Sequence, residues 1–442
     1  MDARPERGGA APPRVAESDE GSRLDPLGRM VPRAVYSGGN EVRLLRGGDE
    51  MFPAMLRAFA AARHEIWLAT YIFHTDPAAS RIAQALADAA KRGVQVKVVV
   101  DGFGSRSTLP ALQPLLCDSG VELTVFRPIH RWWSWLQPGQ LRRLHQKLTV
   151  VDGEVAFVGG INIIDDRLDI GHGWTDAPRL DFAVELRGPV VEPVEQACQA
   201  VWTRARLGRD LREELRRLAA RAEPMARAKR LLSRLRLPAP KAVKGKLADL
   251  PPVRAAFVLR DNLRRRRTIE RSYIAAMRRA KTRIDLASPY FYPGGGFRTA
   301  LRHAARRGVQ VRLLLQGKID YRIAGLAARS LYDELLGVGV RIFEYTPAYL
   351  HAKVALVDDE WATVGSSNID PLSLLLNLEA NVVVRDAGFT SRLAAEFDRA
   401  FAASQEIDPK QSHRSVQGAL RRGLVAWAAH VYLRIAGATG KY

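Results

Sequence analysis

The sequence predicts an α/β protein that contains two copies of one domain. Helical segments alternate with short apolar strands from about position 49 to position 126. The block Ala85–Lys97 returns as Ala300–Arg312, and both blocks contain the run Arg-Gly-Val-Gln-Val. A His-x-Lys segment follows each block, at His145 and at His351. Two long copies with no short period indicate a duplicated domain and not a solenoid.

The elements of the first copy follow from hydrophobic periodicity and from helix stop signals. The pattern predicts a helix around Asp49–Arg63, a strand at Glu65–Phe73, a helix ending near Arg92, a strand at Val94–Val100, a helix at Leu109–Ser119 and a strand at Val121–Phe126. The strand Ile66–Tyr71 has its counterpart at Ile284–Tyr290. Helices that alternate with buried strands of this length predict an α/β sandwich with a largely parallel sheet.

Changes in composition divide the chain into five predicted segments. These are a disordered leader (1–34), a first domain (35–203), a basic helical linker (204–252), a second domain (253–405) and a C-terminal amphipathic segment (406–442). The linker is expected to be mostly a solvated connector, with contact to a lipid surface as the alternative. The C-terminal segment carries an apolar stripe bordered by arginines, which is typical of a helix lying at a membrane interface. A helix that packs on the core or on a second copy is the alternative.

The charge balance favours anionic partners. Lys and Arg outnumber Asp and Glu by 68 to 47, which gives a formal net charge of +21. Nucleic acid and acidic lipid surfaces fit this excess equally well. Cys117 and Cys198 have neither metal-ligand spacing nor a disulfide pattern, which favours a reducing compartment. We expect no signal peptide, and no run approaches the roughly 20 apolar residues that cross a bilayer.

The most specific feature is a motif that occurs twice. It reads His145-x-Lys147-x4-Asp152 and His351-x-Lys353-x4-Asp358, and each copy ends in Gly-x-x-Asn, at Asn162 and at Asn368. His and Lys stand two apart inside a strand-like run, so we expect both side chains on one face of the sheet. Each motif aspartate is expected to begin a turn into a second strand. Polar side chains on an otherwise apolar strand point to a functional site.

Phosphodiester chemistry accounts for these residue types. One imidazole can attack phosphorus to form a phosphohistidine, and a second can protonate the departing alcohol. Two lysines and two asparagines can surround the non-bridging oxygens and stabilise the charge of the transition state. Carboxylates and histidines are not grouped at metal-ligand spacing, so we predict that the site needs no metal and no cofactor.

These residues resemble the phospholipase D superfamily, whose signature His-x-Lys-x4-Asp-x6-Gly-x2-Asn both copies match. The similarity extends to bacterial cardiolipin synthases, above all the B-type enzymes, from Asn40 to about Ala402. It is most specific at Ala156–Asn162, Trp361–Ser373 and Asn377–Asn381. The resemblance implies two duplicated phospholipase-D-like α/β/α domains with mixed sheets around a pseudo-twofold active site. As in the B-type enzymes, we expect no paired N-terminal transmembrane helices.

The resemblance also implies residue roles. His145 would be the nucleophile and His351 the acid and then the base, with the reverse assignment left open. A buried carboxylate would orient each histidine, and Asp181 and Glu379 match the family's positions. The motif residues Asp152 and Asp358 would then support turns and not take part directly. One departure is Gly160, where the second copy has Ser366.

The function implied is that of a cardiolipin synthase on the cytoplasmic side of a bacterial membrane. It would transfer a phosphatidyl group from phosphatidylglycerol, an anionic phospholipid, to a hydroxyl of a second phospholipid. A phospholipase D hydrolase and a nucleic-acid phosphodiesterase are the alternatives. The aromatic and basic loop His130–Trp135 suits a lipid interface, although it would also stack bases. Together with the C-terminal stripe, it favours lipid over nucleic acid. No oligomeric state is predicted.

Overall fold

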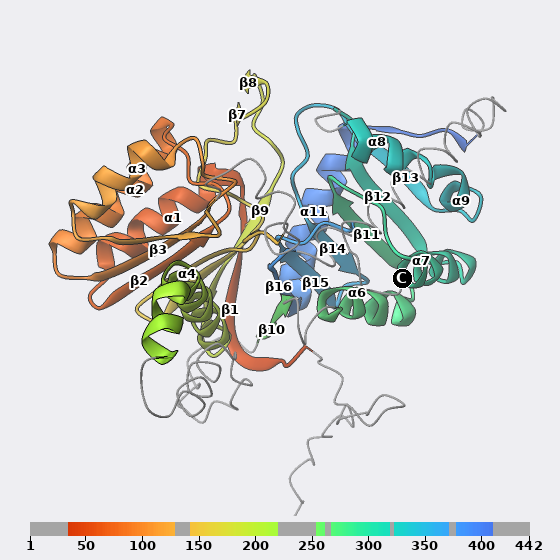
Figure 1. Cartoon of the computed structure of the whole chain (residues 1–442). Coiled ribbons are helices and arrows are strands. Elements are labelled where there is room, and N and C mark those ends of the chain that lie inside the picture. The colour runs from red at the N-terminus through yellow and green to blue at the C-terminus, as the bar shows by residue number, and fades with distance from the viewer. Residues whose placement is uncertain are drawn as a thin grey trace, which may run out of the picture. The chain divides into compact units, whose positions relative to one another are not determined.

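Two similar halves form one continuous sheet with helices on its faces (Figure 1). The computed structural model describes residues 34–128, 142–219, 253–260, 267–318, 322–370 and 377–409. The elements of the first half are β1 (Ser37–Arg46), α1 (Gly47–Ala61), β2 (Glu65–Thr70), α2 (Pro77–Lys91), β3 (Gln95–Asp101), α3 (Leu109–Cys117), β4 (Glu122–Phe126), β5 (Lys147–Val151), β6 (Val155–Gly159), β7 (Leu168–Asp169), β8 (Gly173–Trp174), β9 (Phe182–Arg187) and α4 (Val191–Ala219).

The second half largely repeats this order of strands and helices. Its elements are β10 (Val253–Arg260), α6 (Thr268–Arg279), β11 (Arg283–Ser288), α7 (Gly295–Arg306), β12 (Gln310–Gln316), α8 (Arg322–Arg329), α9 (Tyr332–Leu336), β13 (Arg341–Tyr345), β14 (Val354–Val357), β15 (Trp361–Gly365), β16 (Glu379–Arg385), α11 (Ala387–Ala402) and β17 (Ser404–Glu406). The repeated Arg-Gly-Val-Gln-Val run ends a helix and begins a strand. Its glycines, Gly93 and Gly308, adopt φ values of 93° and 86°, which side chains disfavour.

The strand order shows the duplication directly. The described part of the sheet has 15 strands in the order β17-β13-β12-β11-β14-β15-β16-β10-β1-β9-β6-β5-β2-β3-β4. Read outward from the central antiparallel pair of β1 and β10, the two sides list equivalent strands in the same order, and β17 is an additional edge strand of the second half. The predicted duplicated α/β fold with mixed sheets is therefore confirmed, and a pseudo-twofold axis passes between β1 and β10.

The expectation of a largely parallel sheet was wrong. Only β2-β3-β4 and β11-β12-β13 run parallel, and the remaining described strand pairs of this sheet are antiparallel. The helical crossovers that parallel pairs require occur only within those two triplets. Each motif instead forms a tight hairpin, β5–β6 or β14–β15, and a short turn permits only antiparallel neighbours. The sequence pattern also missed β1, whose first residues include Gly38 and Gly39 and whose polar residues weaken the alternation.

Several predicted segments lie outside the described residues. They are the leader up to position 33, the aromatic loop 130–135, the linker from 220 to 252 and the C-terminal segment from position 410. The helix α4 continues past position 203, where the sequence suggested the end of the first domain. Within the described ranges, no helix combines the length and the apolar character that crossing a membrane requires.

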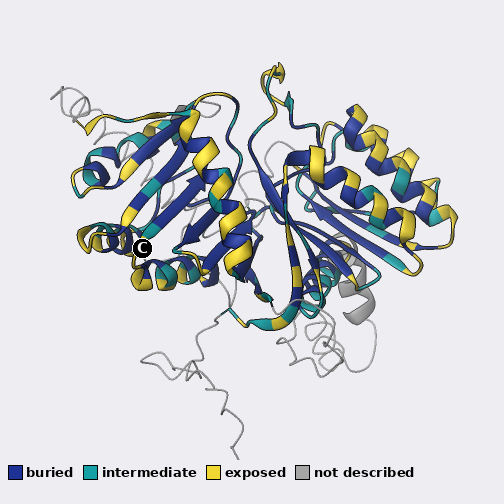
Figure 2. Cartoon of the chain, turned by 180° about the vertical axis from the view of Figure 1, so that it is seen from behind, coloured by how far each residue is buried: buried dark blue, intermediate teal, exposed yellow. Residues whose placement is uncertain are grey.

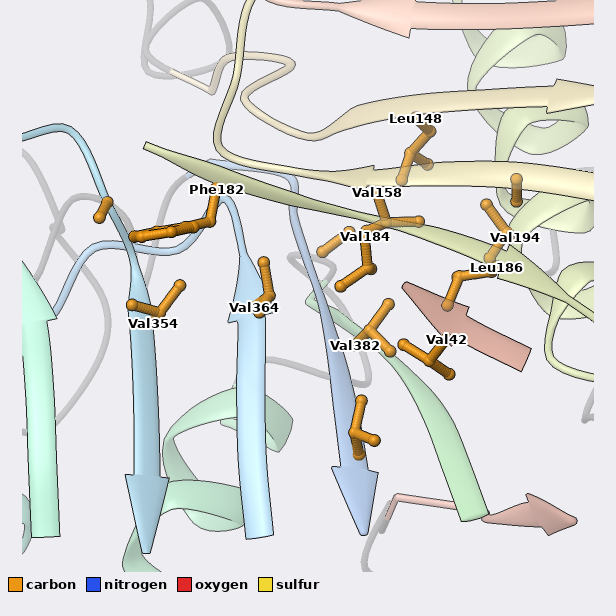
Figure 3. Close-up of a cluster of buried hydrophobic side chains, with 14 of the residues drawn as sticks. Val42, Leu148, Val158, Phe182, Val184, Leu186, Val194, Val354, Val364 and Val382 are labelled. Atoms are coloured by element: carbon orange, nitrogen blue, oxygen red, sulfur yellow. The ribbon is translucent and has the colours of Figure 1, made fainter. Parts of the chain in front are cut away.

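One hydrophobic cluster spans both halves and fixes them as a unit. Figure 3 shows Val42 and Val184 of the first half near Val364 and Val382 of the second half, and all four belong to one buried cluster. Two further clusters lie under α1 and α2 in the first half and under α6 and α7 in the second. Figure 2 shows buried strands beneath helices whose outer faces are exposed. Close packing at the pseudo-twofold axis holds the two motif segments in a defined relation.

Candidate active site

The two motif histidines lie where the halves meet. Short parallel bridges join Leu144 to Leu378 and Leu180 to Leu350 across the boundary between halves. The backbone N–H of His145 donates to the Leu378 carbonyl at 3.0 Å, and that of His351 donates to the Leu180 carbonyl at 2.8 Å. Each histidine segment therefore bonds to the opposite half.

This pairing changes one detail of the expected geometry. We expected His and Lys of each motif inside the same strand, but β5 begins at Lys147 and β14 begins at Val354. The histidines precede these strands because their backbone bonds leave the local ladder and reach the other half.

A buried carboxylate from the opposite half contacts each imidazole. Nδ1 of His145 lies 3.1 Å from Oε2 of Glu379, and Nδ1 of His351 lies 2.6 Å from Oδ2 of Asp181. The side chains of Glu379 and Asp181 are 0% and 1% exposed, whereas those of His145 and His351 are 14% and 22% exposed. A carboxylate accepts from N–H, so each Nδ1 carries a proton, and each Nε2 stays free for chemistry.

The motif lysines lie beside the histidines. Nζ of Lys147 donates to the His145 carbonyl at 2.6 Å, and Nζ of Lys353 donates to the His351 carbonyl. Both side chains are buried. Burial lowers the pKa of Lys147 to about 7, Glu379 opposes this change, and Lys353 adds to it. An anion bound beside Lys147 would raise its pKa again and favour the charged form.

The two histidine–carboxylate pairs differ electrostatically. Burial raises the pKa of Asp181 to about 6. For Glu379, burial alone would raise the pKa, but His145, Lys147 and the Ser366 hydroxyl together hold it below its usual value. Burial also lowers the pKa of both imidazoles, and that of His351 falls well below its ordinary value, with Lys353 contributing. Glu379 is thus the more firmly ionised carboxylate.

The departure at Gly160 has a steric cause. In the second half, the Ser366 hydroxyl donates to Oε2 of Glu379 at 2.5 Å and accepts from the Ala380 N–H at 3.0 Å. In the first half, a Cβ at position 160 would overlap the carboxylate of Asp181. Aspartate is one carbon shorter than glutamate, so its carboxylate lies nearer the neighbouring strand and leaves no room for serine.

The motif asparagines are buried close to the same centre. Oδ1 of Asn162 accepts from the Ile72 N–H at 3.3 Å. Oδ1 of Asn368 has no hydrogen-bond partner among the described residues. Within those same ranges, no group of three or more His, Cys, Asp or Glu side chains has a geometry that could hold a metal ion.

The motif aspartates lie at the other end of each strand from the histidines. Asp152 and Asp358 adopt φ values of 52° and 51° at the hairpin turns. Asp152 accepts from three successive backbone N–H groups, those of residues 63, 64 and 65, each at 2.8 Å. Asp358 accepts likewise from residues 281, 282 and 283. Burial opposes ionisation, but these donors lower the pKa of both aspartates.

Three neighbours of the site were not singled out from the sequence. The Tyr71 ring lies 5.1 Å from the His145 ring, and Nζ of Lys147 lies 5.5 Å from the Tyr71 ring centre. Asp101 accepts from the Leu144 N–H at 2.9 Å, and Gln316 accepts from the Leu350 N–H at 2.7 Å. The repeat held a signal for the two acceptors, because Asp101 and Gln316 end equivalent strands. It held none for Tyr71, which aligns with Pro289.

Comparisons with known proteins agree with this architecture. The duplicated fold and its two motifs define a phospholipase-D-like protein, and the family described as "Cardiolipin synthase, PLD-like domain" matches residues 55–171 and 273–401. Cardiolipin synthase B of Escherichia coli K12 is 36% identical over 371 residues, which is 84% of this chain and 83% of the relative. That of Salmonella typhi is 38% identical over 355 residues, 80% and 79% of the two chains.

The chain belongs to the cardiolipin synthase family with phospholipase-D-like domains, as the sequence motifs predicted. Among solved structures, the phosphatidylserine synthase of Haemophilus influenzae Rd KW20 superposes with a TM-score of 0.61 at 12% identity. The match covers 89% of this chain and 95% of that one, and it establishes a shared fold.

Proposed function

We propose that this protein is a phosphatidyltransferase that makes cardiolipin from two molecules of phosphatidylglycerol. One observation carries the proposal: two imidazoles lie at the pseudo-twofold axis, each held at Nδ1 by a buried carboxylate from the opposite half. This arrangement supplies a nucleophile and an acid–base group at one phosphodiester. Family membership makes phospholipid the substrate class that fits best.

In the proposed first step, Nε2 of His145 attacks phosphorus of the first phosphatidylglycerol. The bond from phosphorus to the terminal glycerol oxygen breaks, and His351 gives its proton to that oxygen, so glycerol leaves. In the second step, His351 takes a proton from the glycerol hydroxyl of a second phosphatidylglycerol. This oxygen attacks phosphorus, the P–N bond breaks, and cardiolipin and free His145 result. One ester bond replaces another, so the reaction requires no nucleotide.

Two differences between the pairs favour His145 as the nucleophile. Glu379 keeps its charge because His145, Lys147 and the Ser366 hydroxyl together lower its pKa against the effect of burial. A charged carboxylate stabilises the imidazolium-like charge that grows on an attacking histidine. The pKa of Asp181 is raised to about 6, so Asp181 stabilises an imidazolium less firmly than Glu379 does, and a protonated His351 would release its proton more readily. The latter property suits the acid and base role.

The other motif residues fit supporting roles. We assign Lys147 and Lys353 to the non-bridging oxygens, because an oxyanion would stabilise ammonium groups that burial disfavours. Asn162 and Asn368 would add amide donors, and Ser366 would fix the Glu379 carboxylate. We assign Asp152 and Asp358 to the hairpin turns and not to the chemistry.

Water competes with the second lipid for the intermediate, so the partially exposed imidazoles make hydrolysis the nearest alternative. We propose that the protein works at the surface of a bacterial membrane, on its cytoplasmic side, where both lipids are present at high local concentration. The net charge of +21 supports attraction to an anionic leaflet.

The test uses the purified full-length protein with labelled phosphatidylglycerol in mixed detergent micelles. We expect cardiolipin and glycerol in equal amounts, and no product from His145→Ala. Phosphatidic acid as the main product would make the protein a hydrolase. Cleavage of DNA or RNA that His145→Ala abolishes, without any lipid product, would replace the proposal with a nuclease.

A further inference from the structure

A small hairpin, β7–β8, projects from the first half near its boundary with the second (Figure 1). The strands β7 and β8 pair from Leu168 to Trp174, and residues 170–172 connect them. Ile170 and Trp174 near its tip are each 61% exposed, the highest values among the large apolar side chains of the described residues. Two such side chains on one tip leave apolar surface in water at a position that no core requirement explains.

The hairpin lies in a stretch of the chain that is longer in the first half than in the second. Nineteen positions separate Asn162 from Asp181, whereas eleven separate their counterparts Asn368 and Glu379. The additional residues of the first half form β7, β8 and their connection. Since both halves build the same frame, the hairpin is an addition to that frame and not a part of it.

The base of the hairpin is firmly held. The Arg179 guanidinium donates to the backbone carbonyls of Asp166 and Leu168, and the Thr175 N–H donates to the Arg167 carbonyl at 2.7 Å. These bonds fix the direction in which the tip projects, so its apolar side chains stay away from the protein's own core.

The hairpin also reaches the second half next to a catalytic histidine. The His172 ring packs on the Tyr349 ring, with centroids 5.6 Å apart, and Tyr349 precedes His351 by two residues. On the other side of the site, Phe103 is 40% exposed and lies beneath the Arg143 guanidinium, 5.5 Å from the ring centre. Arg143 precedes His145 by two residues. Apolar side chains therefore lie beside both histidine segments.

We propose that the hairpin tip, through Ile170 and Trp174, inserts into the surface of an anionic phospholipid bilayer and docks the site on it. This inference rests on the proposed function and names the surface that brings lipid to His145 and His351. Tryptophan favours the membrane interface, where its ring is buried and its N–H stays hydrated.

Charge favours a bilayer as the occupant. Arg106 is exposed three residues after Phe103, Arg167 lies partly exposed at the base of the hairpin, 3.8 Å from Asp49, and the whole chain carries +21. Basic residues beside inserted aromatics are attracted to acidic headgroups. A protein partner would need about 800 Å² of complementary surface on each side, far more than two side chains offer.

The experiment measures binding to vesicles without turnover. Full-length Ile170→Ser/Trp174→Ser is compared with wild type on vesicles of phosphatidylglycerol and phosphatidylcholine and on pure phosphatidylcholine vesicles. We expect partitioning to mixed vesicles to fall by about tenfold or more, since each lost apolar contact is worth over 1 kcal/mol. The thermal unfolding midpoint should stay at the wild-type value, because both side chains are exposed and removing them leaves the core intact.

The matched control is Val35→Ser/Leu115→Ser. These residues are 58% and 39% exposed, and they lie before β1 and in α3. The control should bind vesicles within twofold of wild type. Equal loss in both double variants would overturn the proposal, as would wild-type binding by Ile170→Ser/Trp174→Ser. If the wild-type protein binds pure phosphatidylcholine vesicles as strongly as vesicles that contain phosphatidylglycerol, the contribution of charge is contradicted.

Three further outcomes separate this inference from the proposed function and from self-association. If Ile170→Ser/Trp174→Ser binds vesicles normally but elutes at a smaller size than wild type, the tip is a contact between protein copies and the proposal falls. If wild type makes no cardiolipin in micelles yet binds vesicles through the tip, the docking surface stands and the proposed function falls. Cardiolipin formation in micelles with tip-independent vesicle binding would support the proposed function and overturn the docking surface.

Discussion

The two halves share a frame but differ in the pair of residues behind each imidazole. The second half offers Glu379 with Ser366, and the first offers Asp181 with Gly160. In each half the carboxylate and the small residue fit each other, because the longer acid leaves space for a hydroxyl and the shorter acid fills it. The difference teaches that the duplicated site is asymmetric in charge although it is symmetric in backbone.

The asymmetry gives each histidine a distinct partner. His145 faces the carboxylate with the lowered pKa, and His351 faces the one with the pKa raised to about 6. Because the carboxylates cross between halves, a change in one half acts on the histidine of the other. Variants that alter one half at a time therefore separate the two roles.

The largest effect is expected from the histidines. Both His145→Ala and His351→Ala should reduce cardiolipin synthesis by about 10⁴-fold, since each removes a participating group. A diacylglycerol phosphodiester of p-nitrophenol separates their roles, because this group departs without a proton. His351→Ala should release one equivalent of p-nitrophenol in a burst and retain the phosphatidyl group on His145.

The matched variant in that assay is His145→Ala, which should show no burst. Quenching at alkaline pH preserves the P–N bond, and the intact mass of the protein reports the adduct. A burst in His145→Ala and none in His351→Ala would reverse the assignment. Bursts in both variants would mean that either histidine serves as nucleophile.

An intermediate effect is expected from exchanging the small residues. Gly160→Ser should displace the Asp181 carboxylate and slow transfer by about a hundredfold, as misplacing a catalytic group does. Gly160→Ser/Asp181→Glu copies the pair of the second half and should recover most of the rate. Initial rates in micelles measure both variants.

The corresponding change in the second half is Ser366→Gly. It removes one donor to Glu379 without a clash, so the rate should fall by about tenfold at most. Failure of Asp181→Glu to rescue Gly160→Ser would show that the length of the acid does not explain Gly160.

The smallest effect on activity is expected at the hairpin turns, where the halves are alike. Asp152→Ala and Asp358→Ala should each lower the free energy of unfolding by about 2 kcal/mol, because each leaves three backbone donors without their acceptor. Asp358→Asn should cost less, since asparagine tolerates positive φ. Urea denaturation at pH 7 measures these changes.

The same aspartates set a pH dependence of stability. The fold lowers their pKa, so their contribution is complete above the unfolded value of about 3.9 and is lost as pH falls through the folded value. The variants and wild type should therefore converge in stability as the pH falls below about 3.9. Equal stability at pH 7, or a larger loss of activity than of folded protein, would contradict a role confined to the turns.

Much of this fold and site could be predicted from the sequence, because the duplication repeats each pattern and one copy checks the other. The repeated Arg-Gly-Val-Gln-Val run fixed the helix and strand boundaries to within a few residues, and the motif histidines stood in register with it. The positions of Asp181 and Glu379 came from family resemblance. Their pairing with the opposite histidines depends on the pseudo-twofold axis, which no local pattern encodes.

The missed features have short or irregular signals. The strands β7 and β8 span two residues each, too few for any periodicity. Antiparallel hairpins at β5–β6 and β14–β15 look like parallel strands in sequence, because both are buried on two faces and read as continuous apolar runs. Tyr71 and Asp101 lie at strand ends, where contact with His145 and Leu144 arises only after folding.

Each carboxylate contacts the histidine of the opposite half, so the chain can complete its active site only late in its synthesis. Glu379 lies 234 residues after His145, and Asp181 lies 170 residues before His351. A ribosome that has completed only the first half has made His145 without its carboxylate and Asp181 without its imidazole. On the proposed mechanism, the nascent chain can approach lipid without reacting with it, and chains that terminate early remain inert.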